Sequence, residues 1–184
     1  SLKTSHPIAD VRLKAALNRW LPLSIAVLDC EEADIDFHAR YSCTSKEYIY
    51  KIWNTEVRNP FLDGYALHYR YKLDEDMLNS AAQAYVGTHD FTSFCTLDSR
   101  EKGDMIRTVK AFSVTREGNL VTMKVEADGF LYNMVRIMVG TLLRIQQGKI
   151  PVDGIAGIIE KKDRKFAGPT AQPCGLYLNR ANYD

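Results

Sequence analysis

Arg136 lies in the most apolar stretch of the chain, residues 130–143, with the sequence Phe-Leu-Tyr-Asn-Met-Val-Arg-Ile-Met-Val-Gly-Thr-Leu-Leu. An arginine side chain stays protonated inside a protein, and an unpaired buried charge is costly, so a carboxylate or a phosphate should meet it. The spacing leaves two interpretations open. Arg136 either forms a structural salt bridge or reaches the surface, or it holds a catalytic carboxylate ionised at the floor of a cleft.

Two other groups of titratable residues could also do chemistry. His89 and Asp90 are adjacent and suggest an acid–base pair, but Asp90 suits equally the cap of a turn that positions Phe91 and Phe94. We leave both out of catalysis. Residues 161–165, Lys-Lys-Asp-Arg-Lys, could contact phosphates, although the basic, solvated end of a helix explains them better.

Composition limits the class of protein. The chain has 184 residues, of which 46% are hydrophobic, and this is enough for one well-packed domain. Its 24 Lys and Arg nearly balance 23 Asp and Glu, which gives a formal net charge of +1. This balance excludes a histone-like, heavily basic binder. It leaves a local basic groove open, because the field at a cleft depends on where the charges lie.

The cysteines and the apolar runs predict a cytoplasmic protein with no metal site and no membrane segment. No C-x-x-C pair occurs and no histidine lies at ligand spacing from a cysteine, so we expect no zinc. No signal peptide is evident, and no apolar run approaches the roughly 20 residues that a bilayer requires. We expect reduced thiols that pack as small hydrophobic groups, at Cys30, Cys43, Cys95 and Cys174.

Periodicity predicts the elements that must position these residues. Helical spacing covers residues 8–21, and residues 24–28 are typical of a strand. Alternation over residues 44–53 predicts a further strand that has Tyr48, Tyr50 and Ile52 on one face. A short aromatic strand is expected within residues 65–71.

The second half of the chain adds helices and a hairpin. A helix capped near Asp74 should end by Gly87, and residues 108–115 and 120–127 alternate as the two strands of a β-hairpin. The apolar run 130–143 predicts a long helix, and another should begin at Pro151 and reach the basic cluster. Residues 175–178 predict a final strand. The fold class is therefore α+β, a mainly antiparallel sheet with helices packed on it.

Five local strings occur in one order along most of the chain. They are Phe37-His38-Ala39-Arg40, Lys46-x-Tyr48-x-Tyr50, Gly87-Thr88-His89-Asp90-Phe91-x-x-Phe94, Phe130-x-x-x-Met134-Val135-Arg136-x-x-x-Gly140 and Gly175-Leu176-x-Leu178. Together they resemble the tRNA pseudouridine synthases of the TruA type. The resemblance implies a pseudouridine-synthase-like fold and isomerisation of uridine to pseudouridine in the anticodon stem-loop of tRNA. It further implies no cofactor, tRNA as partner, a homodimer and a cytoplasmic location.

One departure from the family pattern is large. The nucleophilic aspartate of this family lies in a Gly-Arg-Thr-Asp-Ala-Gly string, and no such string occurs here. The resemblance then implies that residues 1–184 form a single C-terminal catalytic domain, truncated at its N-terminus and inactive alone. The alternative is a non-catalytic RNA-binding or dimer-forming module with the same fold. The sequence upstream of Ser1 would discriminate the two.

The resemblance also implies roles for individual residues. Arg136 matches the arginine that pairs with the nucleophilic aspartate. Tyr48 matches the tyrosine that stacks on the flipped target base and takes part in catalysis, although its place in the strand also suits a core-facing aromatic residue. Leu176 matches the apolar residue on the other side of the base, and ordinary core packing also explains it. His38 and Arg40 are candidates for contacts with the RNA backbone, although capping and surface charge also explain them.

Overall fold

The computed structural model describes residues 1–5, 8–96 and 103–183, which divide into two units, Ser1–Cys43 and Thr44–Tyr183. In the first unit, helix α1 (Asp10–Trp20) buries none of its residues. The predicted strand at residues 24–28 is wrong, because this segment bonds to a side chain instead of a second strand. The Asn18 amide donates to the Val27 carbonyl and accepts from the Val27 N–H, both at 2.8 Å.

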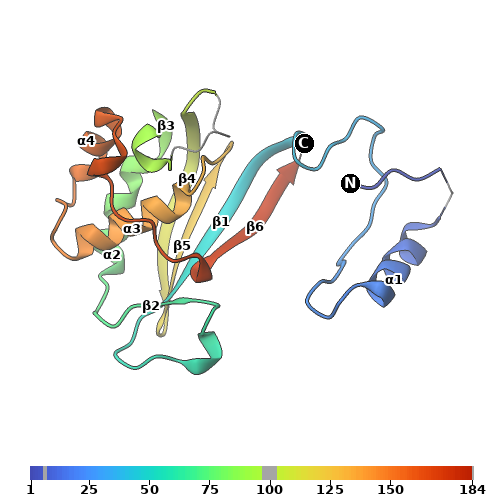
Figure 1. The fold of residues 1–184 in the computed structure, drawn as a ribbon, viewed down its shortest axis with the longest axis horizontal. Helices are drawn as coiled ribbons and strands as arrows, with labels where there is room; N and C mark the ends of the chain where they lie inside the picture. The colour runs from blue at the N-terminus through green and yellow to red at the C-terminus, as the bar shows by residue number, and fades with distance from the viewer. Residues whose placement is uncertain (6–7, 97–102, 184) are drawn as a thin grey trace. The chain divides into compact units, whose positions relative to one another are not determined.

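The second unit is built on a sheet of six strands in the order β2-β1-β5-β4-β3, with β6 also paired to β1 (Figure 1). Contacts of Thr44 with Asn182 and of Lys51 with Tyr177 show that β6 runs antiparallel to β1. Among the strand pairs of the described residues, only the short β1–β2 pair is parallel, so the predicted mainly antiparallel sheet is confirmed. The strands are β1 (Cys43–Trp53), β2 (Leu67–His68), β3 (Gly87–Asp90), β4 (Ile106–Glu117), β5 (Leu120–Ala127) and β6 (Leu176–Tyr183).

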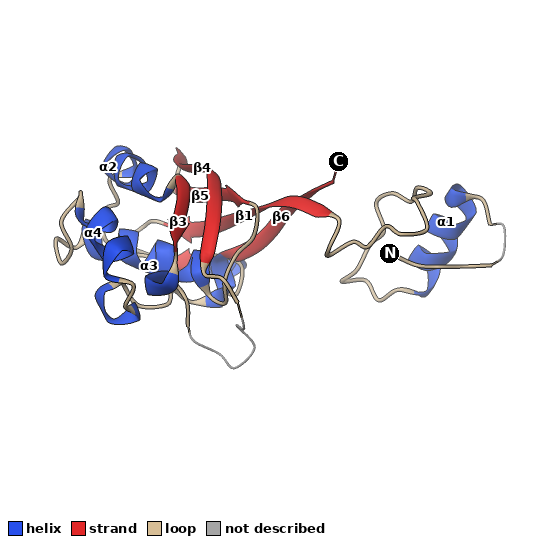
Figure 2. Cartoon of the chain, turned by 90° about the horizontal axis from the view of Figure 1, so that it is seen from above, coloured by secondary structure: helices blue, strands red, loops and turns tan. Residues whose placement is uncertain are grey.

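Helices cover one face of this sheet, as Figures 1 and 2 show. They are α2 (Glu75–Ala82), α3 (Met134–Gln146) and α4 (Gly154–Lys161). The alternation predicted for the hairpin is confirmed in β5, where Val121, Met123, Val125 and Ala127 are buried. In β1, Tyr50 and Ile52 are buried but Tyr48 is half-buried, and in β4 a register shift between Val109 and Ala111 interrupts the alternation. The hairpin turns at Gly118, whose φ of 56° suits glycine. No helix in the described ranges is long and apolar enough to cross a bilayer.

The boundaries of two helices differ from the sequence prediction for local reasons. Helix α3 begins at Met134 because Asn133 adopts a left-handed conformation, φ 62°, which a helix cannot continue through. Helix α4 begins at Gly154, after a turn in which the Gly154 N–H donates to the Pro151 carbonyl. The predicted cap of α2 is confirmed, because the Asp74 carboxylate accepts from the Met77 N–H at 2.9 Å.

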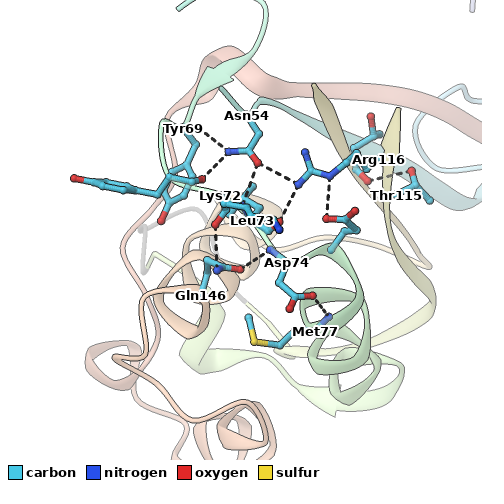
Figure 3. Close-up of polar contacts among 12 residues, drawn as sticks. Asn54, Tyr69, Lys72, Leu73, Asp74, Met77, Thr115, Arg116 and Gln146 are labelled. Carbon is cyan, nitrogen blue, oxygen red and sulfur yellow. Dashed lines mark hydrogen bonds and ion pairs between the residues drawn. The ribbon is translucent and has the colours of Figure 1, made fainter. Parts of the chain in front are cut away.

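Strand β2 is shorter than predicted because a side chain takes over its hydrogen bonds. It pairs with β1 only at Leu67 and His68. Beyond that point the Asn54 amide donates to the carbonyls of Tyr69 and Tyr71 at 2.8 and 2.7 Å (Figure 3). A buried asparagine therefore takes the place of a longer β1–β2 ladder in this part of the chain.

Candidate active site around Arg136

The Arg136 side chain lies in the first turn of α3 and is partly exposed. Its Nε donates to the Ala171 carbonyl at 2.7 Å, and its Nη1 donates to the Asn133 side-chain oxygen at 2.9 Å. Both acceptors are neutral. Among the residues that the structure describes, Arg136 forms no ion pair with a carboxylate.

The Nη2 group of Arg136 reaches solvent. It has no partner among residues 1–5, 8–96 and 103–183, and within these ranges every buried side-chain nitrogen and oxygen has one. Asp128, an internal carboxylate that could have neutralised the arginine, instead accepts from the Thr108 N–H at 3.0 Å. The guanidinium is thus oriented by neutral oxygens and keeps a donor edge accessible to an anion.

Asn133 is a residue of this site that the sequence reasoning missed. Its left-handed backbone aims the side-chain oxygen at Arg136, three positions along the chain, while its Nδ2 donates to Thr96 at 3.3 Å. Asparagine is one of the few residues that adopt this conformation readily. An asparagine inside the apolar run 130–143 was therefore the signal that could have revealed both the helix start and the partner.

Tyr50 links strand β1 to the same site. Its hydroxyl donates to the Gln172 carbonyl at 2.7 Å, next to the Ala171 carbonyl that Arg136 uses. Burial raises the pKa of Tyr50, and nearby Cys174 raises it further, while the positive charge of Arg136 partly offsets both effects. Tyr50 therefore stays a neutral donor that fixes the chain at Gln172.

The two other residues predicted for this site are Tyr48, two positions before Tyr50 on β1, and Leu176, which follows Gly175 beside the Tyr50 ring. Tyr48 is half-buried on the same face of β1, and its ring meets Phe130 edge-on at 5.1 Å between centroids. Burial raises the pKa of the Tyr48 phenol. Leu176 opens β6 and packs against the core, directly after Gly175, where a Cβ would lie 2.9 Å from the Tyr50 ring. Gly175 is needed because backbone and ring approach so closely.

His38 and Arg40 belong to the first unit, in which both are exposed. The Nδ1 atom of His38 accepts from the N–H groups of Arg40 and Tyr41 at 3.1 and 3.3 Å. Its ring also packs on Tyr41, with 4.4 Å between centroids. His38 thereby builds a turn that displays the Arg40 side chain.

The other titratable groups have structural partners. Asp90 accepts from the backbone N–H and the hydroxyl of Thr92 at 3.0 and 2.6 Å, and this places it at the turn that precedes Phe94. Lys162 lies 3.0 Å from the Asp90 carboxylate, and Lys161 lies over the Phe166 ring at 3.9 Å. Within the described ranges, no three His, Cys, Asp or Glu side chains cluster to hold a metal ion.

Comparison with known proteins identifies the family. A family model described as tRNA pseudouridine synthase matches residues 81–184. The tRNA pseudouridine synthase A of a Geobacillus species, strain WCH70, is 46% identical over 93% of this chain and 68% of its own length. Those of Acetivibrio thermocellus and Geobacillus kaustophilus are 43% and 44% identical, each over 98% of this chain and over 73% and 70% of their own lengths. The chain therefore belongs to the tRNA pseudouridine synthases, a family of isomerases.

Proposed function

We propose that this chain supplies the floor of a tRNA pseudouridine synthase active site, where Arg136 holds a nucleophilic aspartate carried by a segment upstream of Ser1. The proposal rests on the hydrogen bonds and the exposure of the Arg136 guanidinium. Its positive charge is oriented by neutral oxygens and its Nη2 edge is accessible, so an incoming carboxylate displaces no existing partner. A bidentate arginine–carboxylate pair is the strongest contact that such an edge can form.

This pair would serve the chemistry directly. Isomerisation breaks the C1′–N1 bond of uridine and forms a C1′–C5 bond. C5 loses its proton, and N1 gains one. The reaction starts from attack by a carboxylate, at C1′ or at C6, and a protonated carboxyl group is a poor nucleophile. An adjacent guanidinium lowers the pKa of the aspartate and keeps it ionised at neutral pH.

The remaining site residues bind the substrate in this proposal. Tyr48 offers its ring to the flipped uracil. Burial raises the pKa of its phenol, so the group would help move the C5 proton as a relay, passing its own proton on as it accepts the one from C5. Leu176 presses on the opposite side of the base and excludes water. His38 and Arg40 contact the RNA backbone, and the exposure of the Arg40 side chain suits this task.

The wider proposal concerns the whole enzyme. Residues 1–184 would form its C-terminal catalytic domain, which is inactive without the upstream aspartate. The chain spans 68–73% of the lengths of the three relatives compared above, and this leaves room for such a segment. We further propose that the enzyme is a cytoplasmic homodimer that acts on the anticodon arm of tRNA.

Tritium release from tRNA labelled at C5 of uridine tests the proposal, in the protein that carries this chain and its upstream segment. We expect Arg136→Ala to lower kcat about a hundred-fold or more, since it removes the charge that holds the nucleophile. Arg144→Ala is the matched control. Arg144 lies on the same helix, and its Nη1 donates only to the Gln147 side chain at 3.3 Å, so this variant should release tritium normally.

Three results would count against this proposal. Unchanged turnover in Arg136→Ala would remove the arginine from catalysis. Tritium release by residues 1–184 alone would show that the nucleophile lies within this chain. A longer protein that binds tRNA but releases no tritium would favour the alternative, a binding or dimer-forming module.

A further inference from the structure

The segment that meets Arg136, residues 168–172, lies directly on helix α3, and we refer to it as the strap. Glycines on both sides make this contact possible. A Cβ on Gly140 would lie 1.7 Å from the Pro169 carbonyl oxygen, and one on Gly168 would lie 2.5 Å from the Gly140 oxygen. Real Cβ contacts are never this short, so helix and strap touch backbone to backbone.

Side chains fix the strap along its length, and in its middle Arg164 Nη2 donates to the Thr170 hydroxyl at 3.3 Å. At its start, the Gly168 N–H donates to the Thr141 hydroxyl at 2.8 Å. Near its end, the Ala171 N–H donates to the Arg136 carbonyl at 3.0 Å, and the Ala171 carbonyl accepts from Arg136 Nε. Tyr50 holds the Gln172 carbonyl. The acceptor that orients the guanidinium is therefore set by contacts on both sides of it.

Thr141 also contacts the core, because its hydroxyl lies beside the buried Tyr85 phenol, whose pKa it lowers against the larger, opposite effect of burial. The Thr141 side chain is fully buried, and its hydroxyl donates to the Ile137 carbonyl at 2.8 Å while it accepts from Gly168. Its only link to Arg136 runs through the strap and the shared helix. A buried hydroxyl that both donates and accepts fixes its neighbours more firmly than an apolar group of the same shape.

We infer that Thr141 is a positioning residue for the reaction, which sets the direction of the Arg136 guanidinium by fixing the start of the strap. The inference rests on the catalytic role proposed for Arg136. Without the hydroxyl, the buried Gly168 N–H loses its acceptor and the strap shifts to find another. The Ala171 carbonyl then moves, and the guanidinium turns away from the position in which it meets the aspartate.

The pair Thr141→Val and Thr141→Ser tests this, because valine keeps the shape and serine keeps the hydroxyl. In the full-length enzyme, we expect Thr141→Val to lower kcat about tenfold to a hundredfold with little change in KM for tRNA, as small misplacements of catalytic groups do. Thr141→Ser should stay within about twofold of the parent, since its hydroxyl can make both bonds. In an Arg136→Lys background, the Thr141→Val effect should largely disappear, because the two residues act in series.

A second measurement separates this inference from the proposed function. In residues 1–184, the ¹⁵N–¹H signal of Arg136 Nε–H, assigned with Arg136→Lys, should shift and exchange faster with water in Thr141→Val but not in Thr141→Ser. Should Thr141→Val not fold, Tyr50→Phe releases the other end of the strap and should move the same signal. The inference would be overturned if the Nε–H signal did not change in Thr141→Val. It would also be overturned if Thr141→Val lowered kcat as much in the Arg136→Lys background as in the parent. A moved signal with normal turnover in Arg136→Ala would instead refute the catalytic role of Arg136.

Discussion

Replacing Asn54 with alanine tests how the chain between β1 and α2 is held. The side chain is 8% exposed and takes part in four hydrogen bonds, which Figure 3 shows together. Its Nδ2 donates to the carbonyls of Tyr69 and Tyr71, and its Oδ1 accepts from the Leu73 N–H and from Arg116 Nη2, both at 3.1 Å. One amide thus uses both of its donors and both lone pairs.

The structure sets the expected size of the effect. Each neutral hydrogen bond contributes about 0.5–1.5 kcal/mol net, and a buried group left without a partner costs about 1–3 kcal/mol. The Tyr69 and Tyr71 carbonyls can bind water after the substitution, and Arg116 keeps its bonds to the Leu73 carbonyl and to Glu75. The buried Leu73 N–H has no such substitute. We therefore expect Asn54→Ala to lower the free energy of unfolding by about 3 kcal/mol.

Urea unfolding measures this loss, and Gln146→Ala provides the matched control. Gln146 is also an amide that holds this segment, accepting from the Asp74 N–H and donating to the Lys72 carbonyl, but its bonds are solvent-exposed. Its removal should cost less than about 1 kcal/mol. Limited proteolysis should cut residues 55–72 faster in Asn54→Ala only. Equal shifts of the urea midpoint in both variants would refute the reasoning, because burial would then have made no difference.

Two further predictions concern glycine and pH. Gly140→Ala should unfold the protein at a much lower urea concentration, because the added methyl group meets the Pro169 carbonyl. Gly157→Ala has open space at its Cβ and should stabilise α4 by about 0.5–1 kcal/mol. Similar urea midpoints for the two variants would contradict the contact between Gly140 and Pro169. For Asp90, burial raises the pKa, but hydrogen bonds from Thr92 and Lys162 outweigh it and lower the pKa below its usual range. The ionised Asp90 carboxylate therefore stabilises the fold above about pH 4, and this contribution is lost as the pH falls through the lowered pKa. We expect the difference in stability between the parent and Asp90→Asn to disappear in acid. Urea midpoints at neutral and acid pH measure this difference. A difference that stays constant with pH would contradict this.

The elements that could be predicted from sequence are those whose signal is local. Alternation placed β1 and the hairpin correctly, and Asp74 was recognised as a cap, because each pattern involves residues close together in the chain. Residues 24–28 have the composition of a strand but find no partner strand. Whether a strand forms depends on what lies beside it, and here the Asn18 side chain takes that place.

The candidate site shows the same division. The contrast between a permanent charge and its apolar neighbours singled out Arg136 from sequence alone. Its partner Ala171 could not be predicted in this way, because the Ala171 carbonyl lies 35 positions along the chain and belongs to the backbone. Side-chain spacing carries no information about backbone acceptors. The closeness of Gly140 and Gly168, which brings that carbonyl to the helix, is likewise a product of tertiary packing.

The neutral oxygens around Arg136 orient the guanidinium without occupying the N–H edge where an anion would bind. Because Asn133 and Ala171 hold the guanidinium without cancelling its charge, an anion can arrive or leave while the scaffold stays as it is. A guanidinium held in this way does not discriminate strongly among small anions, so inorganic phosphate or sulfate would compete with a carboxylate for the open N–H edge. High concentrations of these ions should therefore inhibit the enzyme at this point, separately from their general screening of the RNA.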